Sequence, residues 1–358
     1  MSVHSDTTSP SPRARTLEDV ARLAGVSRNT VSLAIRLSPR VNPTTRDRVL
    51  RIVRETGYRP NYAARALAGR RTTTVGLVRY GSSKMQSDSF YDLILGGLRS
   101  ALEAAQYDLL LFAPTRLVDS HDLTEPIVSG RVDGMVIIGT QTDRGAVANA
   151  FRQGAAIVHV GRRDFGVDVP LVSADEVRGL EEALRHLREH GHRRIALIAE
   201  DLSFEPTRDK VEAYRRSSAE AGMGEESVLA LDVGQAEPER VRQAVSTMLE
   251  RGMTAAVTTR DPLAVAVIRG LRERGVEVPG QFAIIAYDNL EWSPLVEPPL
   301  TCVSPPRFEM GVAAGQMIVS LIEGRSVESP RVLPTQMVRR RSCGCDWSPL
   351  DERGGIGT

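Results

Sequence analysis

From Thr74 onward, short apolar segments rich in β-branched residues alternate with segments of amphipathic helical periodicity. This alternation predicts parallel β-strands covered by helices on both faces. Seven such strands exceed one comfortable sheet, so we expect two α/β halves. The candidate strands span residues 75–79, 108–112, 134–139, 156–161, 194–199, 254–259 and 282–287, and candidate helices between them include 90–105, 178–190, 208–221, 238–251 and 262–274.

The first 75 residues differ from the rest of the chain in charge. They contain 14 Arg, no Lys and five acidic residues, a formal charge of +9, whereas the whole chain carries only +1 and the remainder therefore −8. A basic module joined to a larger acidic body indicates that the first part meets a polyanion. A solvated basic tail is the alternative interpretation.

Several classes of protein are disfavoured by the sequence. No apolar run approaches the ~18–20 residues that span a bilayer. Residues 1–15 are polar and rich in Pro and Ser, which predicts a disordered tail and not a signal peptide. Three cysteines, Cys302, Cys343 and Cys345, are too few for a disulfide framework. We therefore expect a cytoplasmic protein with reduced thiols.

Residues 16–35 carry the pattern of a helix-turn-helix. Thr16 and Asp19 have the spacing of a capping box, Gly25 permits a turn, and Val31 lies where the second helix packs against the first. A third helix is predicted from Asn42-Pro43 to Gly57. A helix of this kind fits the major groove of DNA, although a purely structural helical hairpin has the same spacing.

The exposed face of the second predicted helix presents polar side chains near its start. Arg28 can reach a guanine edge and Asn29 an adenine edge, whereas Leu33 offers only apolar contact, for example to a thymine methyl. Serine and threonine hydroxyls nearby suit phosphate contacts, which fix register without reading sequence.

Residues 16–78 strongly resemble the DNA-binding region of the lactose-repressor (LacI/GalR) family of bacterial transcriptional regulators, and the similarity continues through 130–137, 188–198, 272–289 and 297–303. The resemblance implies a helix-turn-helix domain over 16–60, with Arg28 and Asn29 as the principal base-reading positions. Leu33 stands where many members place an arginine, and Arg36 where asparagine is usual. The DNA-contacting positions that we infer are Ser27, Arg28, Asn29, Thr30, Ser32, Leu33, Arg36, Asn42, Tyr58, Asn61, Arg65 and Leu67.

Residues 61–70 resemble the hinge helix of that family, which folds on DNA and enters the minor groove. A helix of this length is too short to be stable alone in water, so folding on binding to DNA is physically reasonable. Leu67 matches the leucine that pries apart the central base step. An inert linker is the alternative.

The body is similar to a periplasmic-binding-protein-like fold of two doubly wound α/β subdomains. We expect one subdomain from 72–163 with 305–324, a second from 164–304 with 325–342, and a tail from 343–358. The resemblance implies a small-molecule effector in the cleft between them, at the carboxyl ends of the strands. Asp288 matches the ligand-binding aspartate, although it could instead cap the following turn.

The character of the effector is inferred from charge. If Arg162, Lys210, Arg260 and Arg307 border one cleft, a carboxylate or phosphate would compensate them better than a neutral sugar would. We therefore expect a sugar or sugar-derived effector that could be anionic, with Tyr80 and Phe90 as an apolar wall and Asp288 holding a hydroxyl. In the alternative, these cations point to solvent or pair with carboxylates such as Asp164 and Asp261.

Metal and catalytic sites are not expected. His186, His190 and His192 lie close in sequence but lack a further ligand, and Cys343-Gly344-Cys345 supplies two thiols where a tetrahedral site needs four donors. No phosphate-binding, nucleophile or zinc-protease motif is present, so neither enzyme activity nor a cofactor is predicted.

These inferences predict a transcriptional repressor that binds a near-palindromic operator as a homodimer, since one recognition helix reads too few base pairs. A solute-binding protein with the same body fold is the rival interpretation, and the N-terminal helices argue against it.

Overall fold

The computed structural model describes residues 16–35, 38, 40–58, 71–80, 89–112, 122–139, 143–200, 202, 204–224, 228–233 and 237–346. The chain divides into two compact units, Met1–Thr72 and Thr73–Thr358. Among the described residues, no helix is long and apolar enough to cross a bilayer.

The described part of the N-terminal unit contains three helices, α1 (Leu17–Ala24), α2 (Arg28–Ile35) and α3 (Pro43–Thr56). The predicted capping box is present, because the Asp19 amide donates to Thr16 Oγ1 and the Thr16 amide donates to Asp19 Oδ2. Gly25 ends α1 in the left-handed region, at φ 63°. Asn42 caps α3 by accepting a hydrogen bond from the Thr44 amide. The predicted helix-turn-helix is thus confirmed at its ends.

A small core holds these helices together. Val20, Val31, Ala34 and Val49 are almost fully buried and pack with the buried Tyr58 ring. This core is much smaller than those of the second unit, as expected for so short a segment.

The second unit contains two six-stranded sheets. The first has the order β11-β5-β4-β3-β1-β2 and all of its pairings are parallel. Its strands are β1 (Thr74–Arg79), β2 (Asp108–Phe112), β3 (Gly134–Ile138), β4 (Ile157–Val160), β5 (Leu171–Ala174) and β11 (Arg331–Leu333).

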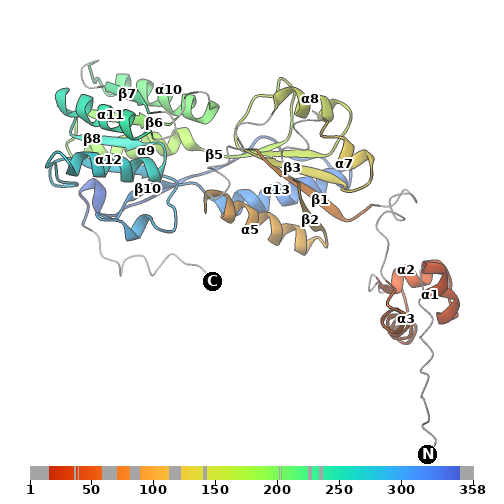
Figure 1. The fold of residues 1–358 in the computed structure, drawn as a ribbon. Helices are drawn as coiled ribbons and strands as arrows, with labels where there is room; N and C mark the ends of the chain where they lie inside the picture. The colour runs from red at the N-terminus through yellow and green to blue at the C-terminus, as the bar shows by residue number, and fades with distance from the viewer. Residues whose placement is uncertain are drawn as a thin grey trace, which may run out of the picture. The chain divides into compact units, whose positions relative to one another are not determined.

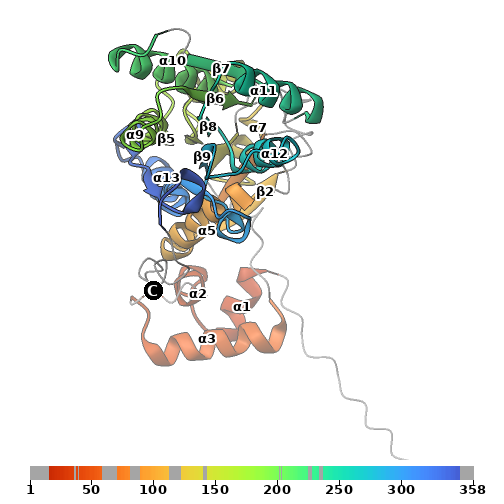
Figure 2. The same cartoon turned by 90° about the vertical axis from the view of Figure 1, so that its left-hand side faces the viewer.

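Helices cover both faces of this sheet (Figures 1 and 2). On one face, α5 (Ser89–Ala104) and α13 (Arg307–Ile322) lie side by side and share a core with alternate residues of the strands. On the other face, α8 (Arg144–Arg152) and the short α7 (Glu125–Val128) contribute to a second core. Burial on both faces explains the continuous apolar sequences of these strands.

The second sheet has the order β12-β10-β9-β8-β6-β7, in which only the β10–β12 pairing is antiparallel. The strands are β6 (Ile195–Ala199), β7 (Val228–Asp232), β8 (Ala255–Thr258), β9 (Ala283–Tyr287), β10 (Thr301–Ser304) and β12 (Gln336–Val338).

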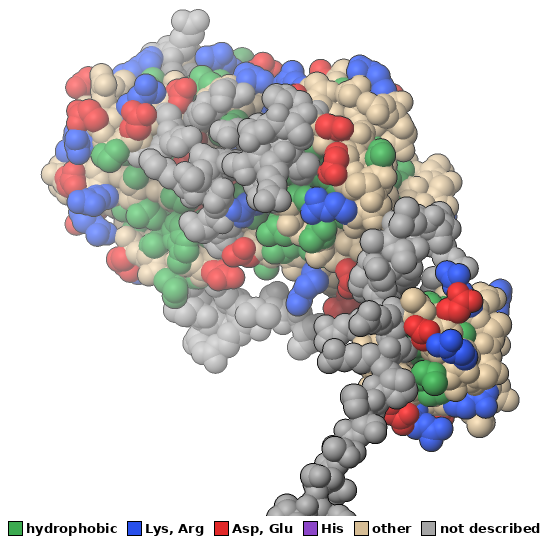
Figure 3. Space-filling view, turned by 45° about the vertical axis from the view of Figure 1, so that its right-hand side comes forward, with side chains coloured by type: hydrophobic (Ala, Val, Ile, Leu, Met, Phe, Trp, Pro, Cys, Tyr) green, Lys and Arg blue, Asp and Glu red, His purple; other side chains and the backbone are tan. Residues whose placement is uncertain are grey.

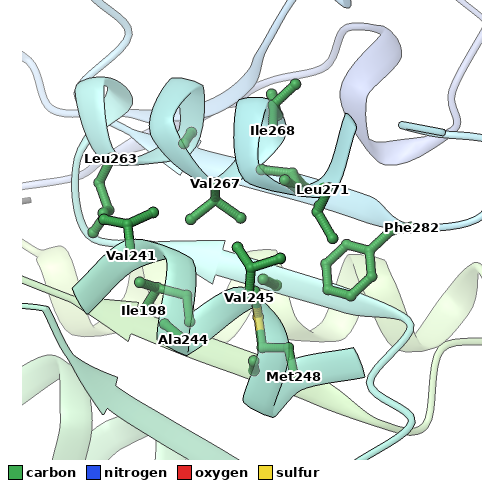
Figure 4. Close-up of a cluster of buried hydrophobic side chains, with 14 of the residues drawn as sticks. Ile198, Val241, Ala244, Val245, Met248, Leu263, Val267, Ile268, Leu271 and Phe282 are labelled. Carbon is green, nitrogen blue, oxygen red and sulfur yellow. The ribbon is translucent and has the colours of Figure 1, made fainter. Parts of the chain in front are cut away.

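Four long helices flank the second sheet. On one face, α11 (Pro238–Glu250) and α12 (Asp261–Arg272) interdigitate apolar side chains, among them Val245, Met248 and Val267 (Figure 4). On the other, α9 (Glu176–Glu189) and α10 (Glu205–Glu220) pack over the opposite strand residues. Short 3₁₀ turns, η3 (Ser293–Leu295) and η4 (Arg341–Cys343), follow β9 and β12.

The chain passes between the two sheets three times, and this corrects the expected subdomain boundaries. Residues 171–174 and 331–333 were assigned to the second subdomain, but as β5 and β11 they pair with each other at the edge of the first sheet. Crossings therefore follow β5, β10 and β11. The boundaries were misplaced because β5, with the sequence LVSA, is less buried than the other four-residue strands and was not recognised as a strand.

Candidate functional site

The exposed face of α2 is the candidate DNA-reading surface. Ser27, Arg28 and Asn29 are exposed at the start of the helix. Ser27 accepts a hydrogen bond from the Thr30 amide, and its hydroxyl lies 2.8 Å from that of Thr30. Ser27 thus acts as the N-cap, which leaves Arg28 and Asn29 on the first turn pointing away from the core.

Other inferred DNA contacts have clear structural roles as well. Ser32 is half-buried, and the half-buried Leu33 packs partly against the small core, so only part of its side chain is available. Tyr58 is 8% exposed and belongs to that core, which makes its ring a packing residue. Arg36, Asn61, Arg65 and Leu67 lie outside the described residues.

A cavity of about 620 Å³ lies between the two sheets of the second unit. Its walls come from the carboxyl ends of strands in both sheets, as Gly139 follows β3, Gly161 follows β4, Glu200 follows β6 and Asp288 follows β9. Ligand sites in open α/β sheets form at such ends. Five of the inferred effector residues line this cavity: Phe90, Arg162, Lys210, Arg260 and Asp288.

Lys210 is buried in the cavity wall and paired. Its Nζ forms a short ion pair with Glu176 and lies 4.5 Å from the centre of the Tyr287 ring. The Tyr287 hydroxyl in turn donates to the Glu176 backbone carbonyl over 2.8 Å. The first turn of α9 is thereby tied to α10 and β9.

Arg260 and Arg162 are also paired with carboxylates. Arg260 Nε donates to Asp288 Oδ2 over 3.0 Å, and its Nη1 lies 3.8 Å from Glu200. Arg162, whose side chain is 62% exposed, bonds Asp209 of α10. That pair therefore joins the two halves across the cavity.

Asp288 is a buried acid in the cavity wall. Burial raises its pKa to about 7, although the adjacent Arg260 opposes that rise. Its backbone adopts φ 113°, a conformation rare for residues other than glycine, and its amide donates to the Val303 carbonyl. Backbone strain at a buried carboxylate is typical of functional positions.

Two inferred effector residues do not line the cavity. Tyr80 packs into the core on the α8 face of the first sheet, where burial raises its pKa to about 12. Arg307 is buried beneath the cavity wall, donates to the Asn289 carbonyl over 2.8 Å and stacks over the Phe90 ring. Arg307 thus supports the loop that carries Asp288.

Some lining residues were missed by the sequence analysis. Tyr91 and Phe204 extend the aromatic wall begun by Phe90. His159, whose pKa burial lowers to about 4, places its ring nitrogens near the Gly139 and Gly161 carbonyls. Glu200 directly follows an apolar strand, as Asp288 does, and that signal could have identified it.

The premise of the expected anionic effector, four cations in one cleft, is met in part. Three of the four cations line the cavity, and five carboxylates line it with them: Asp175, Glu176, Glu200, Asp209 and Asp288. Lys210, Arg162 and Arg260 each bond one of these acids. The open alternative of carboxylate pairing therefore holds, with partners other than Asp164 and Asp261.

Comparisons with known proteins place these features in a family. Residues 16–61 match the model for bacterial regulatory proteins of the lacI family, and residues 184–343 match the periplasmic binding protein-like domain. The transcriptional regulator CelR of Thermobifida fusca is 33% identical over 337 residues, covering 92% of this chain and 98% of CelR. The chain belongs to the lacI family of bacterial regulatory proteins.

This lacI-family protein is accordingly a DNA-binding transcriptional regulator whose activity depends on a bound ligand. Catabolite control protein A of Priestia megaterium is 30% identical, covering 91% of this chain and 98% of that protein. The predicted family and function are thus confirmed.

Solved structures share the fold. The transcriptional regulator CelR–cellobiose complex superposes with a TM-score of 0.66 at 31% identity, covering 92% of this chain and all of that one. A lac repressor dimer bound to operator and the anti-inducer ONPF has a TM-score of 0.75 at 22% identity, covering 93% of this chain and 99% of that one. The fold predicted for this lacI-family regulator is confirmed.

Proposed function

We propose that this regulator is a homodimeric repressor that binds a near-palindromic operator. A neutral saccharide bound in the cavity changes its affinity for that operator. The observation that carries the effector class is the pairing of the cavity cations with carboxylates. An anionic ligand would compete with these carboxylates for the same cations, and more acidic than basic side chains already line the cavity.

The polar groups of the cavity suit hydroxyls. Paired arginines and carboxylates present donors and acceptors at fixed positions, while Phe90, Tyr91 and Phe204 offer apolar surface to a sugar face. A cavity of about 620 Å³ falls within the range that accepts a ligand larger than a fragment. The cellobiose complex of the similar regulator CelR supports a saccharide of this kind.

A thermal-shift screen tests the effector class. Neutral mono- and disaccharides are compared with sugar acids and sugar phosphates, each also against Asp288→Asn. Stabilisation by a neutral saccharide that is lost in Asp288→Asn supports the proposal. Stabilisation by anions alone would instead restore the anionic reading while leaving the regulator assignment intact.

Self-association is supported by apolar side chains on neighbouring elements of the first half. Leu93 and Leu95 of α5, Leu111 of β2 and Phe308 of α13 are each at least 37% exposed. Figure 3 shows hydrophobic side chains among mixed charges on one face of the molecule. Such exposed apolar surface favours burial against a second copy.

Sedimentation of the full chain with and without an operator fragment tests the dimer. We expect two chains per operator, and Leu111→Asp combined with Phe308→Asp to weaken both dimerisation and DNA binding. A monomer that binds the operator at nanomolar concentration would refute the dimer. A gel shift with the promoter of the chain's own gene identifies the operator.

A further inference from the structure

Two histidines and two cysteines from distant parts of the chain converge at the end of α9. His186 and His190 lie one helical turn apart, Cys343 ends η4, and Cys345 follows Gly344. The sequence analysis set each pair aside because neither pair alone provides four ligands. The structure corrects that reasoning by bringing the pairs together across more than 150 residues of sequence.

The separations between three of the donor atoms match those of a tetrahedral metal site. His186 Nε2 lies 3.4 Å from both Cys343 Sγ and Cys345 Sγ, and the two sulfurs are 3.3 Å apart. His190 lies at the edge of this group, with its Nε2 3.6 Å from Cys345 Sγ, and its ring must turn toward the other donors to complete a tetrahedron. Zinc–sulfur bonds of about 2.3 Å and zinc–nitrogen bonds of about 2.0–2.1 Å would put such ligands about 3.3–3.8 Å apart.

The backbone holds the two thiols on one side. Gly344 has φ 90°, a left-handed conformation that turns the chain so that Cys345 returns toward Cys343. Ser342, just before, donates from Oγ to the Ile284 carbonyl over 2.7 Å and accepts from the Thr301 amide over 2.8 Å. The cysteine segment is therefore anchored to the second sheet before any ligand binds.

A polar neighbour also supports ligation by Cys343. Thr301 Oγ1 lies 3.0 Å from Cys343 Sγ and can donate to a thiolate there. Hydrogen bonds to ligating atoms orient them and tune the metal. Cys343 is 1% exposed, so water competes little for the sulfur.

Zinc binds thiolates and neutral imidazoles. A metal must therefore displace the protons of the two thiols, and its apparent affinity will rise with pH.

We propose that His186, His190, Cys343 and Cys345 form a structural zinc site. Binding transfers one proton from each cysteine to solvent and leaves two thiolates and two neutral imidazoles on Zn²⁺, a centre with no net charge. Thiolate and imidazole ligands with tetrahedral spacing select zinc among the common divalent ions. The site ties the segment after β12 to the C-terminal end of α9.

Metal analysis of the full-length protein, purified under reducing conditions, tests the proposal directly. We expect one zinc per chain by elemental mass spectrometry. After removal of zinc, Co²⁺ should produce a thiolate-to-cobalt charge-transfer band and the strong visible bands of tetrahedral coordination. Readdition of zinc should abolish both and raise the melting temperature.

Ligand variants give the matched comparison. Cys345→Ser and His190→Ala change the two more exposed ligands, so the fold should survive, and loss of a direct ligand should weaken zinc binding at least about 100-fold. His192→Ala is the control, because His192 Nδ1 contacts Thr254 Oγ1 at 2.9 Å and not the cluster. It should bind zinc as the parent chain does.

Clear outcomes would overturn the site. These are a reduced chain that yields no thiolate–cobalt band, and zinc affinity unchanged in Cys345→Ser. A third is a chain that, when purified without reductant, has an intact mass two hydrogens lower, as a disulfide would give, and that still binds no metal after its thiols have been reduced. None of these readouts depends on the operator or on the effector.

Discussion

Asp288 combines two properties that are costly to maintain in one residue, a buried carboxyl group and a backbone in the positive-φ region. Arg260 offsets part of the cost of burial, and Glu200 lies near the same guanidinium. The carboxyl group thus lies at a fixed place in the cavity wall and is only partly compensated. A hydroxyl donor would complete its hydrogen bonding.

Asp288→Asn should change the pH dependence of stability. The folded-state pKa of about 7 lies above that of the unfolded chain, so the folded chain binds more protons and its unfolding free energy falls as pH rises from about 4 to about 7. The asparagine side chain does not titrate, so the variant lacks this loss. Relative to that of the parent, its unfolding free energy should rise by a few kcal/mol across that interval. Denaturant titrations at stepped pH values measure the difference. Parallel profiles for the two proteins would contradict the assignment.

Arg28 should contribute base preference and not only affinity. Arg28→Ala is expected to cost about 1–3 kcal/mol on the operator and to relax preference at one base pair of each half-site. Arg54→Ala, an exposed arginine on α3, is the control and should act equally on all sequences. Binding titrations on operator and random DNA distinguish the two. Equal losses on both DNAs for Arg28→Ala would mean that it contacts only phosphate.

Among the elements, the backbones of α5 and α13 come into direct contact. A Cβ at Gly97 would lie 1.9 Å from the Phe308 carbonyl oxygen, and one at Gly311 would lie 2.0 Å from the Ile94 carbonyl oxygen. The two backbones therefore touch where the glycines face each other. Helical glycine is unfavourable by itself, and here the close packing explains its presence.

Adjacent glycines of α5 provide a matched test of that packing. Gly97→Ala should destabilise the chain by at least about 1–3 kcal/mol, because the two helices must separate. Gly96→Ala meets only the Phe308 ring at 3.9 Å and should stabilise by up to about 1 kcal/mol through helix propensity. Thermal unfolding of both variants checks the prediction. Similar effects of the two substitutions would argue against the close contact.

The elements that sequence could identify were those with strong periodicity. All seven predicted strands are present, since each is an apolar run; six of them are largely buried, whereas β2, at the sheet edge, is mostly exposed or half-buried. Strands β5, β7, β10, β11 and β12 were missed because they are short or lie at sheet edges, with polar or exposed residues.

The candidate site was predictable to a similar extent. Positions that follow strand ends, such as Arg260 and Asp288, could be placed at the cavity from sequence order. Their ion pairs could not, because Asp209 and Glu176 reach the cavity only through the packing of α10 and α9. The convergence of His186 with Cys343 likewise depends on how the last described segment docks.

At the scale of the whole molecule, the N-terminal helices and the two-sheet unit are built on different principles. The first unit relies on one small core and capped helices, and the second on four apolar clusters that sandwich two sheets. We expect the first unit to unfold at a lower temperature than the second, because its small core buries much less apolar surface. Calorimetry of the full chain should resolve two transitions, and a single transition would contradict this.

The three crossings between the sheets set an order of assembly during synthesis. The second half is nearly continuous from α9 to β10, whereas the first half lacks α13 and β11 until residues beyond 304 are made. Its core is incomplete without Met310, Ala314 and Ile318. The half that is translated first should therefore fold last. Ribosome-bound chains halted on a linker long enough to carry residue 304 out of the exit tunnel should show protected amides in β6, β8 and β9 and exchanging ones in β1 and β3, the reverse of the usual vectorial order.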